Sequence, residues 1–334
     1  MSRFTATQET FGEFPTINLR DTKTGATAIF ALRGATLLSY SVPLKQGLFN
    51  IIDGYTTAQE LAEHIGARSM IMAPFSNRID KGHYRFNAQD HVLHIANPRD
   101  VAMHGFIGFI DFECKSMSAG DNSAEVVFVN SSIRNTTYQG YPFDVDVEVT
   151  ARLNAQGIAM EIAGINHDDT PVPFGCGWHP YFKTCDTAIE HIKLTVPART
   201  AIAVTDCLIP LLDKEAFVPV ATVFENGFDV CRGSAVNGQV IDKAFTDLVA
   251  DADGIMRTRI EDPQTKIRIT VTQQRGLMHV FTGDTLTVRP RKSIALEPVE
   301  FMTNAFARPD CAERIILGPK QRRGFTFGVS AENI

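Results

Sequence analysis

Four short segments of the chain place an ionisable side chain where the backbone is restricted. They centre on Arg78, His104, His179 and Glu297. Glycine or proline directly follows the last three: glycine lets a ligand approach the backbone closely, and proline holds the preceding residue extended. Arginine can hydrogen-bond two oxygens of one ligand, and histidine and glutamate can exchange protons. These four residues are therefore candidates for ligand binding and proton transfer.

Each candidate also has a purely structural explanation. Arg78 could form an internal ion pair, and His104 could be a core histidine bonded to a carbonyl. His179, in an aromatic segment with the only tryptophan, could belong to a tight turn at a strand end. Glu297 could point to water at a strand edge, although its apolar neighbours favour a raised pKa and a better base. Glu300 would face the opposite side of a continuing strand and is expected to be the solvated carboxylate.

Two histidines and one carboxylate admit two chemistries. They could bind a metal ion as a facial set, or they could act as acid and base groups without a metal. His104, His179 and Glu297 are far apart in the sequence and show no short spacing such as H-x-H. That spacing favours the metal-free chemistry, and no metal or cofactor is expected.

The elements that must position these residues are predicted mainly as short β-strands. Residues 143–149 alternate apolar and acidic side chains, 154–157 supply a turn, and 158–162 resume a strand, so 143–165 predicts a hairpin. Similar runs occur at 28–32, 84–86, 91–95, 124–129, 191–196, 266–271 and 278–282. Helical spacing is rare and is best at 57–66, while the strand pattern around 224–230 is doubtful. Such a pattern is typical of an all-β sandwich or barrel.

Composition excludes several classes of protein. The 334 residues include 32 Lys+Arg and 38 Asp+Glu, a net charge of −6, which disfavours a nucleic-acid partner. The 44% hydrophobic content excludes a disordered chain. The length allows two domains or one large β domain, and no linker or repeat marks a boundary. The motifs favour a single domain over residues 1–334, because residues near both ends would have to meet in one site.

Cysteine usage and hydropathy point to the cytoplasm. The six cysteines are scattered without a C-x-x-C pair, which is typical of reduced thiols. The first 14 residues, MSRFTATQETFGEF, lack the pattern of a secretory signal. No run of about 18 apolar residues occurs, so no membrane span and no membrane partner are expected.

Four of these motifs together resemble the aldose 1-epimerase (galactose mutarotase) family. They are Asn77-Arg78-Ile79 with Gly82, Met103-His104-Gly105, Gly177-Trp178-His179-Pro180-Tyr181-Phe182 and Leu296-Glu297-Pro298. Their order and approximate spacing match, and the resemblance runs from about residue 20 to 328. It implies a large antiparallel β-sandwich of the galactose mutarotase-like supersandwich type, with a sugar pocket on the concave face of one sheet.

The resemblance also implies a role for each matching residue. Glu297 corresponds to the family's base and His179 to its acid. His104, Arg78 and Asn77 correspond to the groups that hold the sugar. In the implied reaction, the Glu297 carboxylate removes the proton from the C1 hydroxyl and protonated His179 gives one to the ring oxygen.

A further sugar-binding aspartate of the family falls in an Asp-x-x-Phe region. Asp242, in Val240-Ile241-Asp242-Lys243-Ala244-Phe245, is the candidate. The sequence departs from the family at Lys243, where histidine is common. Asp229, in Asn226-Gly227-Phe228-Asp229, is the competing choice.

Other functions remain open at the level of sequence. A hexose-6-phosphate 1-epimerase would need a basic phosphate site, for which only Arg78 and Arg68 are at hand. A non-catalytic carbohydrate-binding protein would not need both His179 and Glu297. A metal-dependent enzyme would use His104 with those two residues, and a glycosidase would need a second carboxylate. The sequence names neither the sugar nor the oligomeric state.

Overall fold

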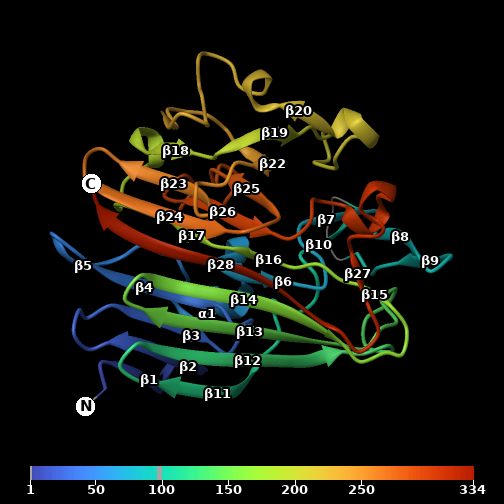
Figure 1. Cartoon of the computed structure of the whole chain (residues 1–334), viewed down its shortest axis with the longest axis horizontal. Coiled ribbons are helices and arrows are strands. Elements are labelled where there is room, and N and C mark those ends of the chain that lie inside the picture. Colours follow the sequence, from blue (N-terminus) through green and yellow to red (C-terminus); the bar gives the residue numbers. More distant parts are fainter. Residues whose placement is uncertain (1, 96–99) are drawn as a thin grey trace.

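The computed structural model describes residues 2–95 and 100–334, and most of its regular structure is antiparallel β-sheet (Figure 1). A nine-stranded sheet crosses the front of the view in Figure 1, and β19 (Ala198–Ile202), β20 (Phe217–Pro219) and β22 (Asp242–Leu248) of an eight-stranded sheet are drawn above it. The strands of the nine-stranded sheet, in spatial order, are β11 (Glu113–Ala119), β12 (Ser123–Ile133), β13 (Val145–Asn154), β14 (Gly157–Asn166), β28 (Arg322–Asn333), β24 (Ile267–Gln273), β23 (Met256–Asp262), β18 (Lys193–Thr195) and β21 (Ser234–Ala235).

The second sheet has eight strands and carries most of the candidate residues. In spatial order its strands are β20 (Phe217–Pro219), β19 (Ala198–Ile202), β22 (Asp242–Leu248), β25 (Leu277–Phe281), β26 (Ile294–Val299), β16 (Gly177–His179) and β6 (Met70–Met72), and β17 (Tyr181–Phe182) also pairs with β26. Strands that are neighbours here come from distant parts of the chain, so this sheet gathers residues that the sequence separates.

The N-terminal segment forms a five-stranded meander, and three two-stranded pairs complete the sheets. The meander contains β1 (Phe4–Phe11), β2 (Phe14–Asp21), β3 (Thr27–Ala31), β4 (Leu37–Leu44) and β5 (Gly47–Asn50). The pairs are β7 (Arg78–Asp80) with β10 (Val101–Met103), β8 (His83–Phe86) with β9 (Gln89–Val92), and β15 (Val172–Pro173) with β27 (Ile316–Leu317).

Helices are short and lie in the connections. The one α-helix, in the described part of the chain, is α1 (Ala58–Glu63), whose first turn is capped by Thr57 through a bond from the Glu60 N–H. The 3₁₀ helices are η1 (Ile65–Ala67), η2 (Ile189–His191), η3 (Asp213–Ala216), η4 (Val220–Thr222), η5 (Ala305–Ala307) and η6 (Pro309–Cys311). No described helix has the length and apolar character needed to cross a membrane.

One hydrophobic core joins the three large sheets. Phe30 of the meander, Ile162 of the nine-stranded sheet and Leu296 of the eight-stranded sheet are all fully buried in the same cluster. Along β13, Val145, Val147 and their alternate neighbours point into this core, as the period of two predicts. The predicted all-β sandwich is therefore confirmed.

Several predicted elements are found with shifted bounds. The 143–165 hairpin is present as β13 and β14, which pair from Val145 with Asn166 to Asn154 with Gly157. The predicted helix at 57–66 divides into α1 and η1, and the predicted strand at 91–95 ends at Val92 in β9. No strand forms within the described residues 224–230. All six cysteines are free, as their scattered spacing predicts.

The expectation that Glu300 is solvated is wrong. Its exposed fraction is 1%, its carboxylate accepts a hydrogen bond from Arg275 Nη1 at 2.6 Å, and it forms an ion pair with Arg323, whose Nε lies 3.0 Å away. The reason is that β26 is a central strand whose six residues are all buried, so both of its faces are covered. A side chain that turns away from the face of Glu297 therefore enters the protein interior and needs charged partners there.

Candidate functional site

Glu297 lies in the middle of a row of polar side chains that crosses the eight-stranded sheet. It pairs directly with His279 of β25. On its other side, the chain of β16 and β17 pairs Gly177 with Val299 and Tyr181 with Ala295, which brings His179 beside Glu297. His179 Nε2 and Glu297 Oε1 are 3.3 Å apart. The predicted acid and base residues are therefore in contact.

Asp242 completes this row at the start of β22. Ala244 pairs with His279, so Asp242 is the diagonal neighbour of that histidine across the two strands. His279 Nε2 donates a hydrogen bond to Asp242 Oδ1 at 2.8 Å. The spatial order across four neighbouring strands is Asp242, His279, Glu297 and His179.

The pair formed by β7 and β10 brings Arg78 and His104 to the same site. Arg78 pairs with Met103, and the His104 N–H donates to the Asn77 carbonyl oxygen at 2.8 Å. Asn77 and His104 both adopt left-handed backbone conformations, with φ of 57° and 60°. These turns, before β7 and after β10, place Arg78 and His104 at one side of the row of polar side chains.

Gly105 is required for this arrangement by a close backbone approach. Its φ is 73°, and a Cβ atom at this position would lie 1.9 Å from the carbonyl oxygen of Ala73. The sequence predicts that glycine after His104 permits close approach of a ligand. The structure shows instead that the close neighbour is the protein's own backbone, which fixes the position of His104.

Asn77 holds the side chain of Arg78. Arg78 Nη1 donates a hydrogen bond to Asn77 Oδ1 at 2.8 Å, and both residues are buried. The positive charge of Arg78 is close enough to act on His104, Asp242 and Glu297. The structure thus brings Arg78 into the site and gives Asn77 a contact with the guanidinium.

Aromatic and imidazole rings enclose His179 on two sides. The His104 ring lies edge-on to the His179 ring, with 5.4 Å between centroids and 79° between planes. Tyr181 stacks on His179 at 5.1 Å and 24°. The Arg68 guanidinium in turn lies 5.0 Å from the centroid of the Tyr181 ring. These contacts fix the orientation of the His179 ring.

Burial shifts the pKa values of Glu297 and of two histidines near it, His179 and His104. It raises the pKa of Glu297 to about 7, because the carboxylate loses hydration. It lowers the pKa of His179 to about 3 and that of His104 well below its usual value. Within this pair the proton affinity is therefore higher at Glu297 than at His179.

His279 differs from the other two histidines of the site, because its pKa is raised. Burial lowers its pKa, but the neighbouring Glu297 charge and the hydrogen bond to Asp242 outweigh burial, and the net pKa is raised. Burial likewise raises the pKa of Asp242, but the hydrogen bond to His279 and the charges of His279 and Arg78 together outweigh burial and bring that pKa to about 2. Both shifts favour an ion pair between His279 and Asp242, whose side chains are 9% and 30% exposed.

The structure separates the two candidate aspartates. Asp242 belongs to the row, and its side chain is 30% exposed. Asp229 lies in a different turn, where its side chain is 45% exposed, 3.4 Å from Arg232, and accepts a hydrogen bond from a neighbouring backbone N–H. Geometry therefore brings Asp242, and not Asp229, together with Glu297 and His179.

His279 is the residue of the row that the sequence motifs do not indicate. It lies within the predicted strand at 278–282, with apolar residues on either side and no adjacent glycine or proline. One signal was available: a single histidine in an apolar strand is a buried polar residue and needs a partner. That signal alone does not say which partner it finds.

Polar atoms of this site are buried without a partner among the residues that the structure describes. They include Glu297 Oε2 and His104 Nδ1. Buried polar atoms cost free energy unless they form hydrogen bonds. A ligand with several hydroxyl groups would satisfy them.

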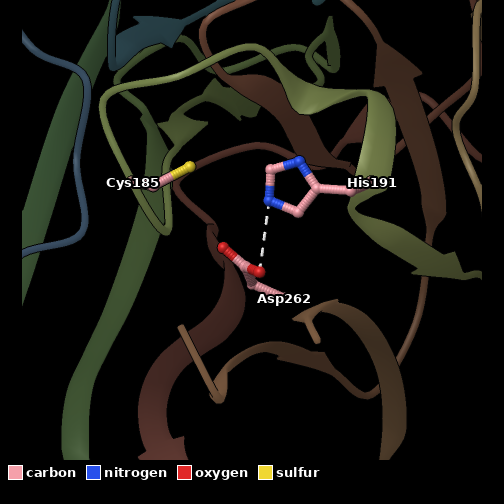
Figure 2. Close-up of side chains that lie close together, drawn as sticks. All are labelled: Cys185, His191 and Asp262. Atoms are coloured by element: carbon pink, nitrogen blue, oxygen red, sulfur yellow. Dashed lines mark ion pairs between the residues drawn. The ribbon is translucent and has the colours of Figure 1, made fainter. Parts of the chain in front are cut away.

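One trio of metal-binding side chains is found in the described part of the chain, and it lies elsewhere. Cys185, His191 and Asp262 each place a ligand atom within 4.8 Å of the others (Figure 2). His191 Nε2 lies 3.2 Å from Asp262 Oδ1, but that oxygen already accepts two backbone N–H groups of the turn after β23. The other oxygen accepts from a threonine hydroxyl. Asp262 therefore caps a turn, and a cation would have to displace those bonds.

Comparison with known proteins agrees with the fold. The family model for aldose 1-epimerase matches residues 15–330. The uncharacterized protein YihR of Escherichia coli (strain K12) is 26% identical over 245 residues, 73% of this chain and 72% of that protein.

Solved structures of low identity share the fold. The galactose 1-epimerase of Lactobacillus acidophilus is 15% identical and has a TM-score of 0.81, with 100% of this chain and 99% of that chain covered. A GalM/aldose epimerase homologue from C. elegans is 18% identical with a TM-score of 0.80, over 93% of this chain and 97% of that one. The chain therefore belongs to the aldose 1-epimerase family, whose members are isomerases that act on sugars.

Proposed function

We propose that this protein interconverts the α and β anomers of a free aldose, with Glu297 and His179 as the proton-transferring pair. The observation that carries the proposal is their contact of 3.3 Å between two buried side chains. Anomer exchange needs one group to take a proton and one to give a proton at two adjacent oxygens. A glutamate and a histidine in contact, each on a strand of a rigid sheet, supply both groups.

The reaction opens and recloses the sugar ring. Glu297 takes the proton of the C1 hydroxyl, the bond between C1 and the ring oxygen breaks, and His179 gives a proton to the ring oxygen. Rotation about the C1–C2 bond turns the other face of the aldehyde to the C5 hydroxyl. On reclosure His179 takes the proton of the C5 hydroxyl and Glu297 gives its proton to the C1 oxygen. Both residues then hold the protons that they held at the start. A well-placed acid or base of this kind contributes about 10²–10⁴-fold to the rate.

The active form of the pair holds one proton in total. In the free protein that proton rests on Glu297, because burial favours the neutral form of both side chains. A sugar that donates its C1 hydroxyl to Glu297 stabilises the carboxylate, since hydrogen bonds to a charged form favour that form. Binding therefore moves the proton toward His179, which can then act as the acid.

Four further residues, Arg78, His104, Asp242 and Asn77, are proposed to hold the sugar. The Arg78 guanidinium stabilises negative charge as it develops on a sugar oxygen, and His104 offers its buried Nδ1. Asp242 uses Oδ1 for His279 and, being partly exposed, can accept a sugar hydroxyl with its other oxygen. Asn77 keeps Arg78 in place and also lies at the edge of the sugar site.

The structure offers poor support for a phosphorylated sugar. Arg68, the second arginine that the sequence offers for a phosphate, is 1% exposed. Its Nη1 bonds to Asp53, and its Nη2 bonds to the Val288 carbonyl at 2.9 Å. It is therefore committed to the fold, which favours a free aldose over a hexose 6-phosphate.

An anomerisation screen tests this proposal. Freshly dissolved α-glucose, α-galactose and α-glucose 6-phosphate are followed by polarimetry with and without the protein. We expect catalysed relaxation of at least one free aldose and slower relaxation of the phosphorylated sugar. Relaxation of every free aldose at the uncatalysed rate would contradict the proposal, and a preference for the phosphate would favour the hexose-6-phosphate alternative.

A further inference from the structure

His279 lies in the middle of the polar row and is almost completely buried. It is 7% exposed, stands opposite Glu297 in the antiparallel register of β25 and β26, and donates to Asp242 at 2.8 Å. Directly opposed residues of an antiparallel pair have their side chains on one face, with Cβ atoms about 4.5–5.5 Å apart. The imidazole is therefore bonded to the carboxylate of Asp242 on one neighbouring strand and lies beside Glu297 on the other.

The titratable and charged groups around His279 come from every strand that faces it. These are Asp242 on β22, Glu297 on β26, Arg78 at the start of β7, His179 on β16 and His104 after β10. Burial keeps His179 and His104 neutral, and Arg78 is positive. The two acidic neighbours favour a charged imidazole, and the Asp242 bond gives that charge a fixed partner.

We propose that His279, fixed by Asp242, is a positioning residue whose positive charge holds Glu297 as a carboxylate when the sugar binds. A buried carboxylate is costly without a nearby opposite charge. Arg78 supplies one such charge, and His279 supplies another from the adjacent strand. This inference deepens the proposed function and rests on it for the identity of the reaction.

The sign of the effect follows from charge alone. Replacing His279 by a neutral residue removes a positive charge near both Glu297 and His179. Each group then holds its proton more tightly, so both pKa values rise. An opposite charge within about 4–6 Å shifts a carboxyl pKa by about 1–3 units, and the effect falls with distance, so Glu297 should respond more than His179.

Carbon NMR of the glutamate carboxyl groups tests this directly and needs no activity. In the wild-type protein we expect one carboxyl signal to titrate near pH 7, and its absence from Glu297→Gln assigns it. In His279→Gln, whose amide can still donate to Asp242, that midpoint should rise by about one unit or more. An unchanged midpoint would overturn the proposal. His83→Gln, at an exposed position of β8, is the matched control and should leave the midpoint unchanged.

Nitrogen NMR of the imidazole rings covers the case in which His279→Gln does not fold. In the wild-type protein, His279 should stay doubly protonated at pH values where an ordinary histidine has lost its charge. Its midpoint should fall in Asp242→Asn. A neutral His279 in the wild-type protein at neutral pH would overturn the proposal.

The pH dependence of kcat/KM links the same residue to the reaction. In His279→Gln the alkaline limb should move to higher pH, by the same amount as the carboxyl midpoint. A purely structural role would lower the rate by one factor at every pH and leave the limb in place. If the wild-type protein fails to exchange anomers while the carboxyl titration behaves as expected, the proposed function fails and the electrostatic role of His279 stands.

Discussion

Glu297 and His179 hold their protons differently from the same residues in water. Burial raises the pKa of the glutamate to about 7 and lowers that of the histidine to about 3. The order of proton affinity is therefore the reverse of that in water, where histidine is the stronger base. This reversal lets one proton move between the two residues as the sugar oxygens change charge.

A bell-shaped pH dependence follows at the residue scale. The active pair carries one proton, so kcat/KM should fall as pH rises through the Glu297 pKa of about 7, because the pair then loses that proton. On the acid side it should fall only toward about pH 3, where His179 also binds a proton. Polarimetric rate measurements across this pH range determine both the acid and the alkaline limb of the kcat/KM profile. A rate that rises steadily above neutral pH would contradict the single-proton form.

Arg78→Lys tests the guanidinium. Lysine keeps the charge but loses the planar fork that bonds Asn77 and a sugar oxygen together. We expect kcat/KM for anomer exchange to fall about 10–100-fold, near the lower end of losses seen when one preorganised donor is removed. Arg85→Lys is the matched control, since Arg85 is 64% exposed in a surface ion pair. Equal activity of the two variants would show that Arg78 does not bind the sugar.

At this scale the sequence predicts most of the site. Arg78, His104, His179 and Glu297 meet as predicted, because proline and glycine mark the restricted backbone at three of them. His279 escapes prediction because its partners, Asp242 and Glu297, come from other strands, whose register the sequence does not reveal. The prediction that Glu300 is solvated is wrong for a related reason. Alternation along the strand predicts that its side chain lies on the face opposite Glu297, but it does not predict that this face is also buried.

The strand ends that carry His104 and Arg78 are short and depend on backbone contacts. The β7 and β10 pair has only three residues in each strand, so turn geometry and the approach of Gly105 to Ala73 hold it in place. The position of His104 should therefore be sensitive to a single methyl group at Gly105.

Gly105→Ala tests this element. The new Cβ would lie 1.9 Å from a backbone oxygen and would require φ of 73° from an L residue. We expect a loss of at least about 2 kcal/mol in the free energy of unfolding in urea, together with reduced activity. Gly120→Ala is the control, because its Cβ would meet nothing within 4 Å. If both variants unfold at the same urea concentration, the close approach does not constrain the fold.

Elements differ in how well their sequence predicts them. The β13 and β14 hairpin is predicted because each strand has ten residues and alternates in polarity, and because a short turn connects the two strands. The strands β6, β16 and β17 have two or three residues and are buried on both faces. They show no alternation, because nothing along them faces water.

The eight-stranded sheet and the nine-stranded sheet are joined by charge as well as by apolar packing. Glu300 follows β26, Arg275 lies between β24 and β25, and Arg323 belongs to β28. Arg275 hydrogen-bonds the buried Glu300 carboxylate at 2.6 Å, and Arg323 forms an ion pair with it at 3.0 Å. This cluster lies on the face of β26 away from Glu297, so it supports the site without entering it.

Glu300→Gln should therefore reduce stability. The amide cannot balance two arginines. We expect a loss of about 2 kcal/mol in the free energy of unfolding, since a hydrogen bond to a charged group, such as that from Arg275, contributes about 1.5–3 kcal/mol and both arginines are partly exposed. Denaturant titration monitored by Trp178 fluorescence measures it. Glu332→Gln removes a surface partner of Arg268 and should change little. Similar losses in both variants would contradict a specific role for the buried cluster.

The assembly of the whole molecule is the part that sequence patterns predict least. Periodicity and turns indicate an all-β chain, and the resemblance of four motifs indicates which sandwich it forms. The neighbours of Glu297 come from β16, β25 and, through His279, β22, which are separated by long stretches of sequence. Such pairings depend on packing of complete sheets and are absent from any local pattern.

The most direct test of the central claim is the rate of anomer exchange at equilibrium, measured by NMR exchange on a free aldose accepted by the wild-type protein. Glu297→Gln and His179→Asn should each slow exchange by about 10²–10⁴-fold while the sugar still binds. His83→Gln, at an exposed position, should match the wild type. Exchange in the two site variants at the wild-type rate would contradict proton transfer by this pair.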